Sequence, residues 1–316
     1  MFEYLPISLS SLRSNTVSGC DIYLLVHVEG ADRYVLYCKG DDLFDKSKRE
    51  LLIRKNINRL FINKEDQKKF FDYLESNFQY VLSNGKVSPH ERIKVVYNTA
   101  INMIQSVFKD PNPENILKSR RFAHNMVEFI LQDVSNSYGM LKLHLDEYYT
   151  YAHTVNVATM GTLFAHGLGV QKDDLKQLCS GMLFFDLGKT QINQSLLEKK
   201  GRLTEEEFEK IKKHPELGDN ILRKTGNGLK EESIITLQHH ENYDGSGYPY
   251  GLKREEIHSC AKIVRIIDIY DALTTKRPYA NPLPPFDALK TIKSEMSNVV
   301  DPIIFKRFIR FLGGYT

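Results

Sequence analysis

The chain of 316 residues is long enough for one large domain and a small one, and its 41% hydrophobic and 26% charged residues are ordinary for a globular protein. Its 43 basic and 40 acidic residues leave a net charge of +3, which argues against a dedicated nucleic-acid binder. No apolar run reaches the roughly 18 residues of a membrane span. The N-terminus lacks the basic and apolar regions of a signal peptide. The scattered cysteines form no CxxC pair, so we expect thiols in a reducing cytoplasm: Cys20, Cys38, Cys179 and Cys260.

Residues 1–85 are predicted to form a small α/β domain. Segments rich in β-branched and aromatic residues predict strands, and apolar stripes at helical spacing predict helices. In chain order these are strands at 21–29 and 33–39 joined by a turn at 30–32, a helix at 45–56, a strand at 58–63 and a helix at 65–82. A breaker-rich linker follows at 83–89. The domain carries no recognisable chemistry, so we expect a regulatory or dimerising role.

Residues 86–316 are predicted to form an all-helical domain, because apolar residues recur there at helical spacing. Thr204 and Glu207 have the spacing of a capping box, which predicts a helix start. The other predicted helices lie at 90–108, 111–134, 147–166, 172–189, 216–224, 229–241, 259–275, 284–297 and 299–312. The expected fold class is therefore mainly α, with a helical domain behind a small α/β domain.

Residues 239–249 are the most informative string, reading His-His-Glu-Asn-Tyr-Asp-Gly-Ser-Gly-Tyr-Pro. Further histidines and carboxylates that suit the same chemistry are His153, Asp186, His214 and Asp268. Imidazole and carboxylate ligands together favour borderline or hard divalent metals. Asp268 interrupts an apolar helical run, where a buried carboxylate needs a partner such as a metal.

The dispersed candidates also have ordinary structural explanations. A single helical histidine is more often a core or surface residue than a ligand. His214 could simply precede a helix. Asp268 could be a buried carboxylate paired with Arg265 or Arg277.

Taken in order, these pieces resemble the signature of HD-GYP domains, the bacterial metal-dependent phosphodiesterases that hydrolyse cyclic di-GMP. The resemblance covers residues 145–315, and the string at 239–249 matches one of its most specific motifs. It implies an all-helical HD-type phosphohydrolase domain that opens cyclic di-GMP to the linear dinucleotide or to GMP.

The resemblance also implies roles for single residues. It implies two divalent ions, iron or manganese. His153 and Asp268 would complete one metal site, and His214, His239 and His240 would complete the other. Asp186 would bridge both ions and, with Lys189, act in catalysis. Asp186 and Lys189 lie one helical turn apart, hence on one face. The substrate would contact Gly247 and Tyr248 of the Gly-Tyr-Pro turn and Arg277, while Asp244 would stabilise the loop.

Three positions depart from the family pattern. Phe185 stands where the family has the histidine of the His-Asp pair, and a phenylalanine has no donor atom. One of the two metal positions would therefore lose a ligand, and it could bind metal weakly, fill with water or stay empty. Phe185 could also be a core-facing residue with the site rebuilt around it. Tyr149 stands where some members carry a glutamate that supports a third ion, and Ala280 stands where a further basic residue contacts phosphate.

Three functions are compatible with these residues. The first is a metal-dependent cyclic di-GMP phosphodiesterase, weakened by the loss of one ligand. The second is a degenerate HD-GYP domain that binds a cyclic dinucleotide or a protein partner as a signalling module. The third is a phosphohydrolase acting on another nucleotide. We favour the enzyme and expect a cytoplasmic protein in signal transduction, without DNA binding and without a membrane span; a protein partner and a homodimer stay open.

Overall fold

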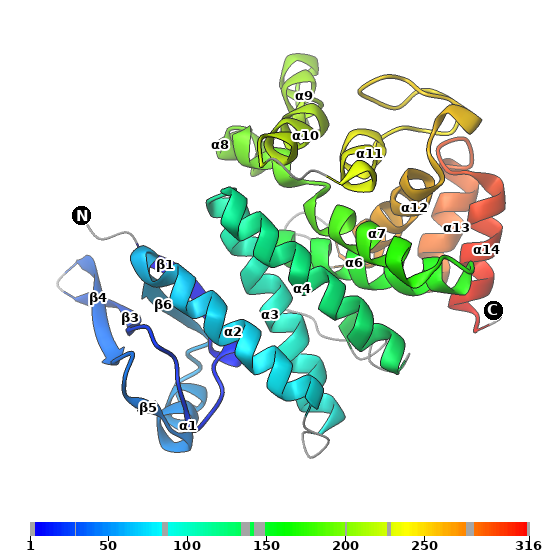
Figure 1. The fold of residues 1–316 in the computed structure, drawn as a ribbon. Helices are drawn as coiled ribbons and strands as arrows, with labels where there is room; N and C mark the ends of the chain where they lie inside the picture. Colours follow the sequence, from blue (N-terminus) through cyan, green and yellow to red (C-terminus); the bar gives the residue numbers. More distant parts are fainter. Residues whose placement is uncertain are drawn as a thin grey trace. The chain divides into compact units, whose positions relative to one another are not determined.

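A computed structural model describes residues 4–28, 30–83, 88–133, 140–141, 149–199, 201–225, 229–275 and 281–314 (Figure 1). The chain divides into two compact units, Met1–Met103 and Ile104–Thr316, and the division falls within α3 (Pro89–Lys109). The domain boundary predicted between residues 85 and 86 lies outside the described residues and stays a prediction. Among the helices that are described, none combines the length and the apolar character needed to cross a bilayer.

The smaller unit contains a four-stranded antiparallel sheet with the order β1-β6-β3-β4. Its strands are β1 (Tyr4–Ser8), β3 (Ile22–Val28), β4 (Ala31–Cys38) and β6 (Arg59–Asn63), while β2 (Thr16–Val17) pairs with β5 (Leu43–Phe44). β3 and β4 are the two strands predicted first, and Val28 pairs with Ala31, so their connection is shorter than the predicted turn. Gly30 allows this because it adopts a φ of 78°.

Strand β1 was not among the predicted strands, and it contains Pro6. Proline cannot donate a ladder hydrogen bond and argues against a strand unless the strand lies at an edge. β1 is an edge strand, since it pairs only with β6, and Pro6 stands opposite Phe61 in the register.

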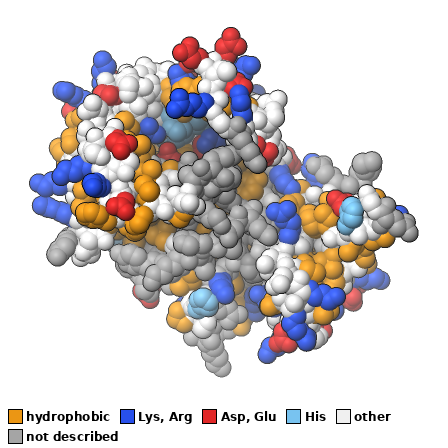
Figure 2. Space-filling view, turned by 180° about the vertical axis from the view of Figure 1, so that it is seen from behind, with side chains coloured by type: hydrophobic (Ala, Val, Ile, Leu, Met, Phe, Trp, Pro, Cys, Tyr) orange, Lys and Arg blue, Asp and Glu red, His pale blue; other side chains and the backbone are white. Residues whose placement is uncertain are grey.

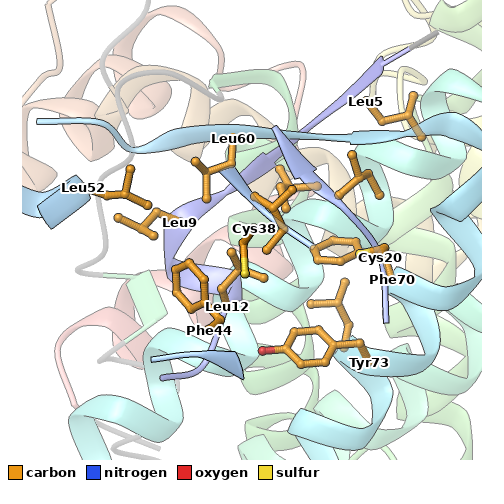
Figure 3. Packing of buried hydrophobic residues seen from close by; sticks show 14 residues of the cluster. Leu5, Leu9, Leu12, Cys20, Cys38, Phe44, Leu52, Leu60, Phe70 and Tyr73 are labelled. Atoms are coloured by element: carbon orange, nitrogen blue, oxygen red, sulfur yellow. The ribbon is translucent and has the colours of Figure 1, made fainter. Parts of the chain in front are cut away.

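The core of the smaller unit joins one face of the sheet to two helices, α1 (Lys46–Arg54) and α2 (Gln67–Ser83) (Figure 3). Alternate strand residues point to the same face, which places Leu5 and Leu60 in this core. Leu52 joins them from α1 and Phe70 from α2. The antiparallel sheet and its two helices confirm the predicted small domain.

The larger unit is helical, as predicted. Its helices beyond α3 are α4 (Pro113–Gln132), α6 (Tyr149–Gly167), α7 (Lys172–Phe184), α8 (Gln194–Leu197), α9 (Glu205–Ile211), α10 (His214–Lys224), α11 (Lys230–Gln238), α12 (Ser259–Thr274), α13 (Pro285–Glu295) and α14 (Pro302–Leu312). Short 3-10 helices are η1 (Leu9–Ser11), η2 (Lys64–Asp66), η3 (Leu187–Gln191) and η4 (Arg254–Glu256). The predicted capping box of Thr204 and Glu207 is present at the start of α9.

Helix α12 is central to this packing, because it contacts α6, α11, α13 and α14 (Figure 1). Helix α7 packs against α4, α6 and α11, and η3 packs against α10. The candidate residues are therefore carried by neighbouring elements, although they are far apart in the sequence.

Two of the helices that lead into candidate residues end earlier than predicted. The helix predicted over 172–189 ends at Phe184, and a turn then leads into η3. The helix predicted over 229–241 ends at Gln238. In both cases the helix ends just before the candidate residues. The periodicity of apolar residues therefore predicted an end that is too late for each helix.

Candidate metal centre

Three helix ends converge on the candidate centre. Asp186 lies in the turn between α7 and η3, with φ −96° and ψ 5°. His214 begins α10, and Pro215 follows in the first turn, where a missing N–H costs no hydrogen bond. His239 and His240 come directly after the last residue of α11.

Gly188 makes the close approach of η3 and α10 possible. A Cβ atom on Gly188 would lie against the carbonyl oxygen of His214 and 2.5 Å from the amide nitrogen of Gly218. Only a residue without a side chain lets the two backbones meet in this way. This contact brings Asp186 within reach of His214.

Asp186, His214, His239 and His240 form a cluster that could hold a metal ion. Each offers one ligand atom, and these atoms all lie within 4.8 Å of one another. The Nε2 atom of His214 lies 3.4 Å from Oδ1 of Asp186, and that of His239 lies 3.7 Å from the same oxygen. Three of the four residues are buried and His240 is half-buried. Figure 2 shows histidine side chains recessed among charged side chains on one face of the larger unit.

The hydrogen bonds of two histidines decide which nitrogens face the cluster. Nδ1 of His214 donates to the carbonyl oxygen of Ile211 at 2.8 Å, and Nδ1 of His239 donates to that of Thr236 at 2.9 Å. A neutral imidazole with this hydrogen bond carries its proton on Nδ1 and presents a lone pair at Nε2. The two Nε2 atoms lie 3.1 Å apart. Two facing lone pairs repel each other unless a cation lies between them.

The Asp186 carboxylate also matches a cation. Its Oδ2 accepts a hydrogen bond from Nζ of Lys189 at 2.6 Å. Its buried Oδ1 has no hydrogen-bond partner among the described residues. Since a buried polar atom without a partner is costly, this oxygen and the two imidazole nitrogens fit a divalent ion.

The protonation states support ligand binding. Burial disfavours the charged form of Asp186, but Lys189 and the neighbouring imidazoles outweigh it and hold the pKa of this carboxyl well below its usual range. Burial lowers the pKa of His214 to about 3, against the opposing effect of Asp186. Burial also lowers the pKa of His240 well below its usual value. At neutral pH the carboxylate is charged and both of these imidazoles are neutral, as metal ligands must be.

His153 and Asp268 lie in a different arrangement. Nε2 of His153 is 3.1 Å from Oδ1 of Asp268, and its Nδ1 is 2.6 Å from Oδ2 of Asp271. Burial opposes protonation of His153, but the two carboxylates outweigh it and raise its pKa to about 9. Phe185 packs with its ring centroid 6.0 Å from that of His153 and 4.9 Å from that of His239. The structure thus groups four predicted ligands and pairs the remaining two with each other.

The Gly-rich loop covers one side of the cluster. The ring of Tyr248 stacks on that of His240, with centroids 4.7 Å apart, and its peptide bond to Pro249 is cis. A Cβ atom on Gly247 would lie 2.5 Å from the carbonyl oxygen of His240, so a glycine is needed there. Asp244 accepts hydrogen bonds from the amide and the hydroxyl of Ser246, at 2.9 and 2.6 Å, and so stabilises the loop.

The structure does not describe the side chains at three further predicted positions. Arg277 and Ala280 lie outside the described residues. Tyr149 begins α6, but its side chain is not among those described. Their roles stay predictions.

Asp271 had no predicted site role, and Arg265 was predicted only as one possible partner of Asp268. Asp271 accepts a hydrogen bond from His153 and another from Asn156 at 3.1 Å. Arg265 contacts Asp268, with 3.6 Å between Nη1 and Oδ2. Both residues lie three positions from Asp268 on α12, hence on the same face of that helix. Helical spacing around Asp268 was the signal that could have found them.

Relatives of the chain carry the function that the motifs indicate. A cyclic di-GMP phosphodiesterase of Pseudomonas aeruginosa is 30% identical over 239 residues, which cover 74% of this chain and 58% of that protein. A cyclic di-GMP phosphodiesterase of Thermotoga maritima is 35% identical over 162 residues, which cover 51% of this chain and 44% of that protein. The chain therefore spans about half the length of these relatives. They confirm the resemblance to HD-GYP proteins.

A solved structure shows the same fold. An HDG"Y"P protein from Bdellovibrio bacteriovorus matches with a TM-score of 0.76, covering 99% of this chain and 100% of its own, at 21% sequence identity. The family model described as HD domain matches residues 138–304, more than half of the chain. These residues include all four of the clustered histidine and aspartate ligands. The chain therefore belongs to the HD domain family.

Proposed function

We propose that this chain is a metal-dependent phosphodiesterase that hydrolyses cyclic di-GMP to the linear dinucleotide or to GMP. One observation carries the proposal: the Nε2 atoms of His214 and His239 face each other at 3.1 Å beside an Asp186 oxygen without a hydrogen-bond partner among the described residues. That donor set suits a divalent ion such as iron or manganese. The names of the relatives indicate the substrate class.

A divalent ion held by the cluster would supply an activated water and a Lewis acid for the phosphodiester. The chain's own residues would hold the substrate around it. Lys189, whose side chain is 29% exposed, would attract a phosphate oxygen while keeping Asp186 charged. Burial raises the pKa of Tyr248, so its hydroxyl stays protonated and can donate to the substrate. Arg277 and the backbone at Gly247 would complete the phosphate contacts.

Two ions are expected from the family resemblance, and the cluster of four residues would be the strong site. The second ion would depend on His153 and Asp268, which contact each other directly, with Phe185 beside them. We also propose a cytoplasmic role in signal transduction. A protein partner and a homodimer are further parts of the proposal that rest on the resemblance alone.

The test is hydrolysis of cyclic di-GMP by protein loaded anaerobically with Fe²⁺ or Mn²⁺, followed by chromatography of the linear dinucleotide and GMP. His214→Ala should lose bound metal and reduce the rate on the order of 100-fold or more, as when a charge-stabilising group is removed. His166→Ala is the matched control, because His166 is exposed at the end of α6. Full activity in His214→Ala, or no hydrolysis by metal-loaded wild type, would sink the proposal.

A further inference from the structure

Arg265 is a largely buried cation that the proposed chemistry does not use. Its side chain is 18% exposed. Its Nε and Nη2 atoms donate to Oδ1 of Asn242 at 3.1 and 2.8 Å. Its Nη1 atom lies 3.2 Å from Nδ1 of His240 and 3.6 Å from Oδ2 of Asp268. The guanidinium thus joins a member of the four-residue cluster to a carboxylate predicted for the other metal position.

The contact with His240 restricts that imidazole. A guanidinium has donors only, so Nδ1 of His240 accepts the hydrogen bond from Arg265. The neutral ring then carries its proton on Nε2, and neither nitrogen has a free lone pair. His214 and His239 are opposite in this respect, because their Nδ1 atoms donate to backbone carbonyls. Three ligand atoms therefore remain, from Asp186, His214 and His239.

The contact with Asp268 has a matching effect. One oxygen of this carboxylate faces His153 at 3.1 Å, and the other faces Arg265 at 3.6 Å. Both oxygens therefore already have cationic or hydrogen-bonding partners from the protein. Phe185 supplies an aromatic ring, and no donor atom, between His153 and His239. A second ion would have to displace these partners and lie beside a permanent positive charge.

We propose that Arg265 takes the place of a second metal ion as a built-in cation, so that the centre holds one ion on Asp186, His214 and His239. The inference deepens the proposed function and rests on it, since it assigns the number of ions to the same site. It replaces the two ions expected from the resemblance with one, and it leaves His240 out of the ligand set. Three protein ligands leave coordination positions open for water and phosphate, as in catalytic rather than structural metal sites. Phe185 removes a ligand for the second ion, and the guanidinium of Arg265 supplies a positive charge in place of that ion.

The test is metal content per chain, measured by mass spectrometry after loading with Mn²⁺, together with electron paramagnetic resonance. Wild type should hold one ion with the spectrum of an isolated Mn²⁺. Phe185→His should still hold one, because Arg265 remains. Phe185→His with Arg265→Ala should hold two and show a coupled pair. Phe185→His with Arg310→Ala, which removes an exposed arginine on α14, is the matched control and should hold one.

Two ions in wild type, or in Phe185→His alone, would overturn the inference. So would one ion in a folded Phe185→His/Arg265→Ala protein. If that double variant does not fold, Arg265→Met in the Phe185→His background keeps the packing of the stem and must give the same two ions. One ion without hydrolysis would contradict the proposed function and leave the inference standing. Hydrolysis with two ions in wild type would do the reverse.

Discussion

Burial decides what single ionisable residues can do in this chain. At the candidate centre it keeps imidazoles neutral, and burial lowers the pKa of His214 to about 3. Elsewhere it suppresses reactivity instead. Burial raises the pKa of Cys20 and of Cys179 to about 12, and all four cysteines are free thiols. Burial therefore keeps candidate metal ligands neutral in one place and keeps cysteine thiols protonated and unreactive in another.

The thiols give a prediction with a defined pH dependence. In the native protein at about pH 8, Cys20 and Cys179 should not react with DTNB, because only the thiolate reacts. Cys260 is half-buried and should react first. The folded state keeps the Cys179 proton that an unfolded chain releases near pH 9, so this contribution to stability is present below pH 9 and lost between pH 9 and about 12.

Thiol titration with and without denaturant checks this expectation. All four cysteines should react after unfolding. Rapid labelling of Cys179 in the folded protein would show that its surroundings open readily, and would contradict the assignment. Mass spectrometry of the labelled peptides identifies which cysteine has reacted.

Among the elements, the approach of η3 to α10 matters most for the centre. Gly188→Ala would place a Cβ against the carbonyl oxygen of His214, and two backbones cannot give way as a flexible side chain can. We expect a loss of about 1–3 kcal/mol in the free energy of unfolding, typical of overpacking. Metal binding should weaken as well, since His214 would move away from Asp186.

Urea unfolding and Mn²⁺ calorimetry measure the two effects. Thr190→Ala is a control in the same 3-10 helix. It removes only the hydrogen bond from the Thr190 hydroxyl to the carbonyl oxygen of Leu187, at 2.8 Å, and should leave metal affinity unchanged. Equal metal affinity in Gly188→Ala and wild type would mean that this contact does not position the centre.

At the scale of the whole larger unit, a buried ion pair joins two helices that carry or support the centre. Nε of Arg120 on α4 donates to the two carboxylate oxygens of Glu232 on α11 at 2.9 and 3.0 Å, and Nη2 adds a third hydrogen bond at 2.8 Å. Glu232 is fully buried and Arg120 nearly so. Its hydrogen bonds join α4 to α11, so we expect its role to be structural.

Glu232→Ala should lower the free energy of unfolding by about 3–5 kcal/mol, because it leaves the Arg120 charge buried without its partner. The double variant Arg120→Met/Glu232→Leu should recover most of that loss, since well-packed apolar residues can replace a buried pair. Arg223→Ala tests a surface pair, with Arg223 66% exposed beside Asp219, and should cost at most about 1 kcal/mol. Urea unfolding of the four proteins gives the comparison, and a Glu232→Ala loss no larger than that of Arg223→Ala would contradict it.

Many of the secondary-structure elements could be predicted from the amino-acid sequence. Helical periodicity is local, so it located the long helices of the larger unit, although the short α8 was not predicted. The capping box of Thr204 and Glu207 marked a helix start correctly. The ends of α7 and α11 were placed too late, because they depend on contacts between elements. The edge strand β1 was missed, since a proline is acceptable only where a neighbouring strand is absent on one side.

The family, the mainly helical fold and the set of candidate ligands follow from the amino-acid sequence alone, because motif residues and their order are properties of the linear chain. The family resemblance already implies that these ligands divide into two groups. The three-dimensional fold adds the contacts within each group: Asp186, His214, His239 and His240 lie together, and His153 contacts Asp268 directly. Which nitrogen faces the cluster and which carboxylate is already neutralised depend on hydrogen bonds between residues far apart in the chain. Such contacts have no local signal, so no reading of spacing or periodicity could supply them.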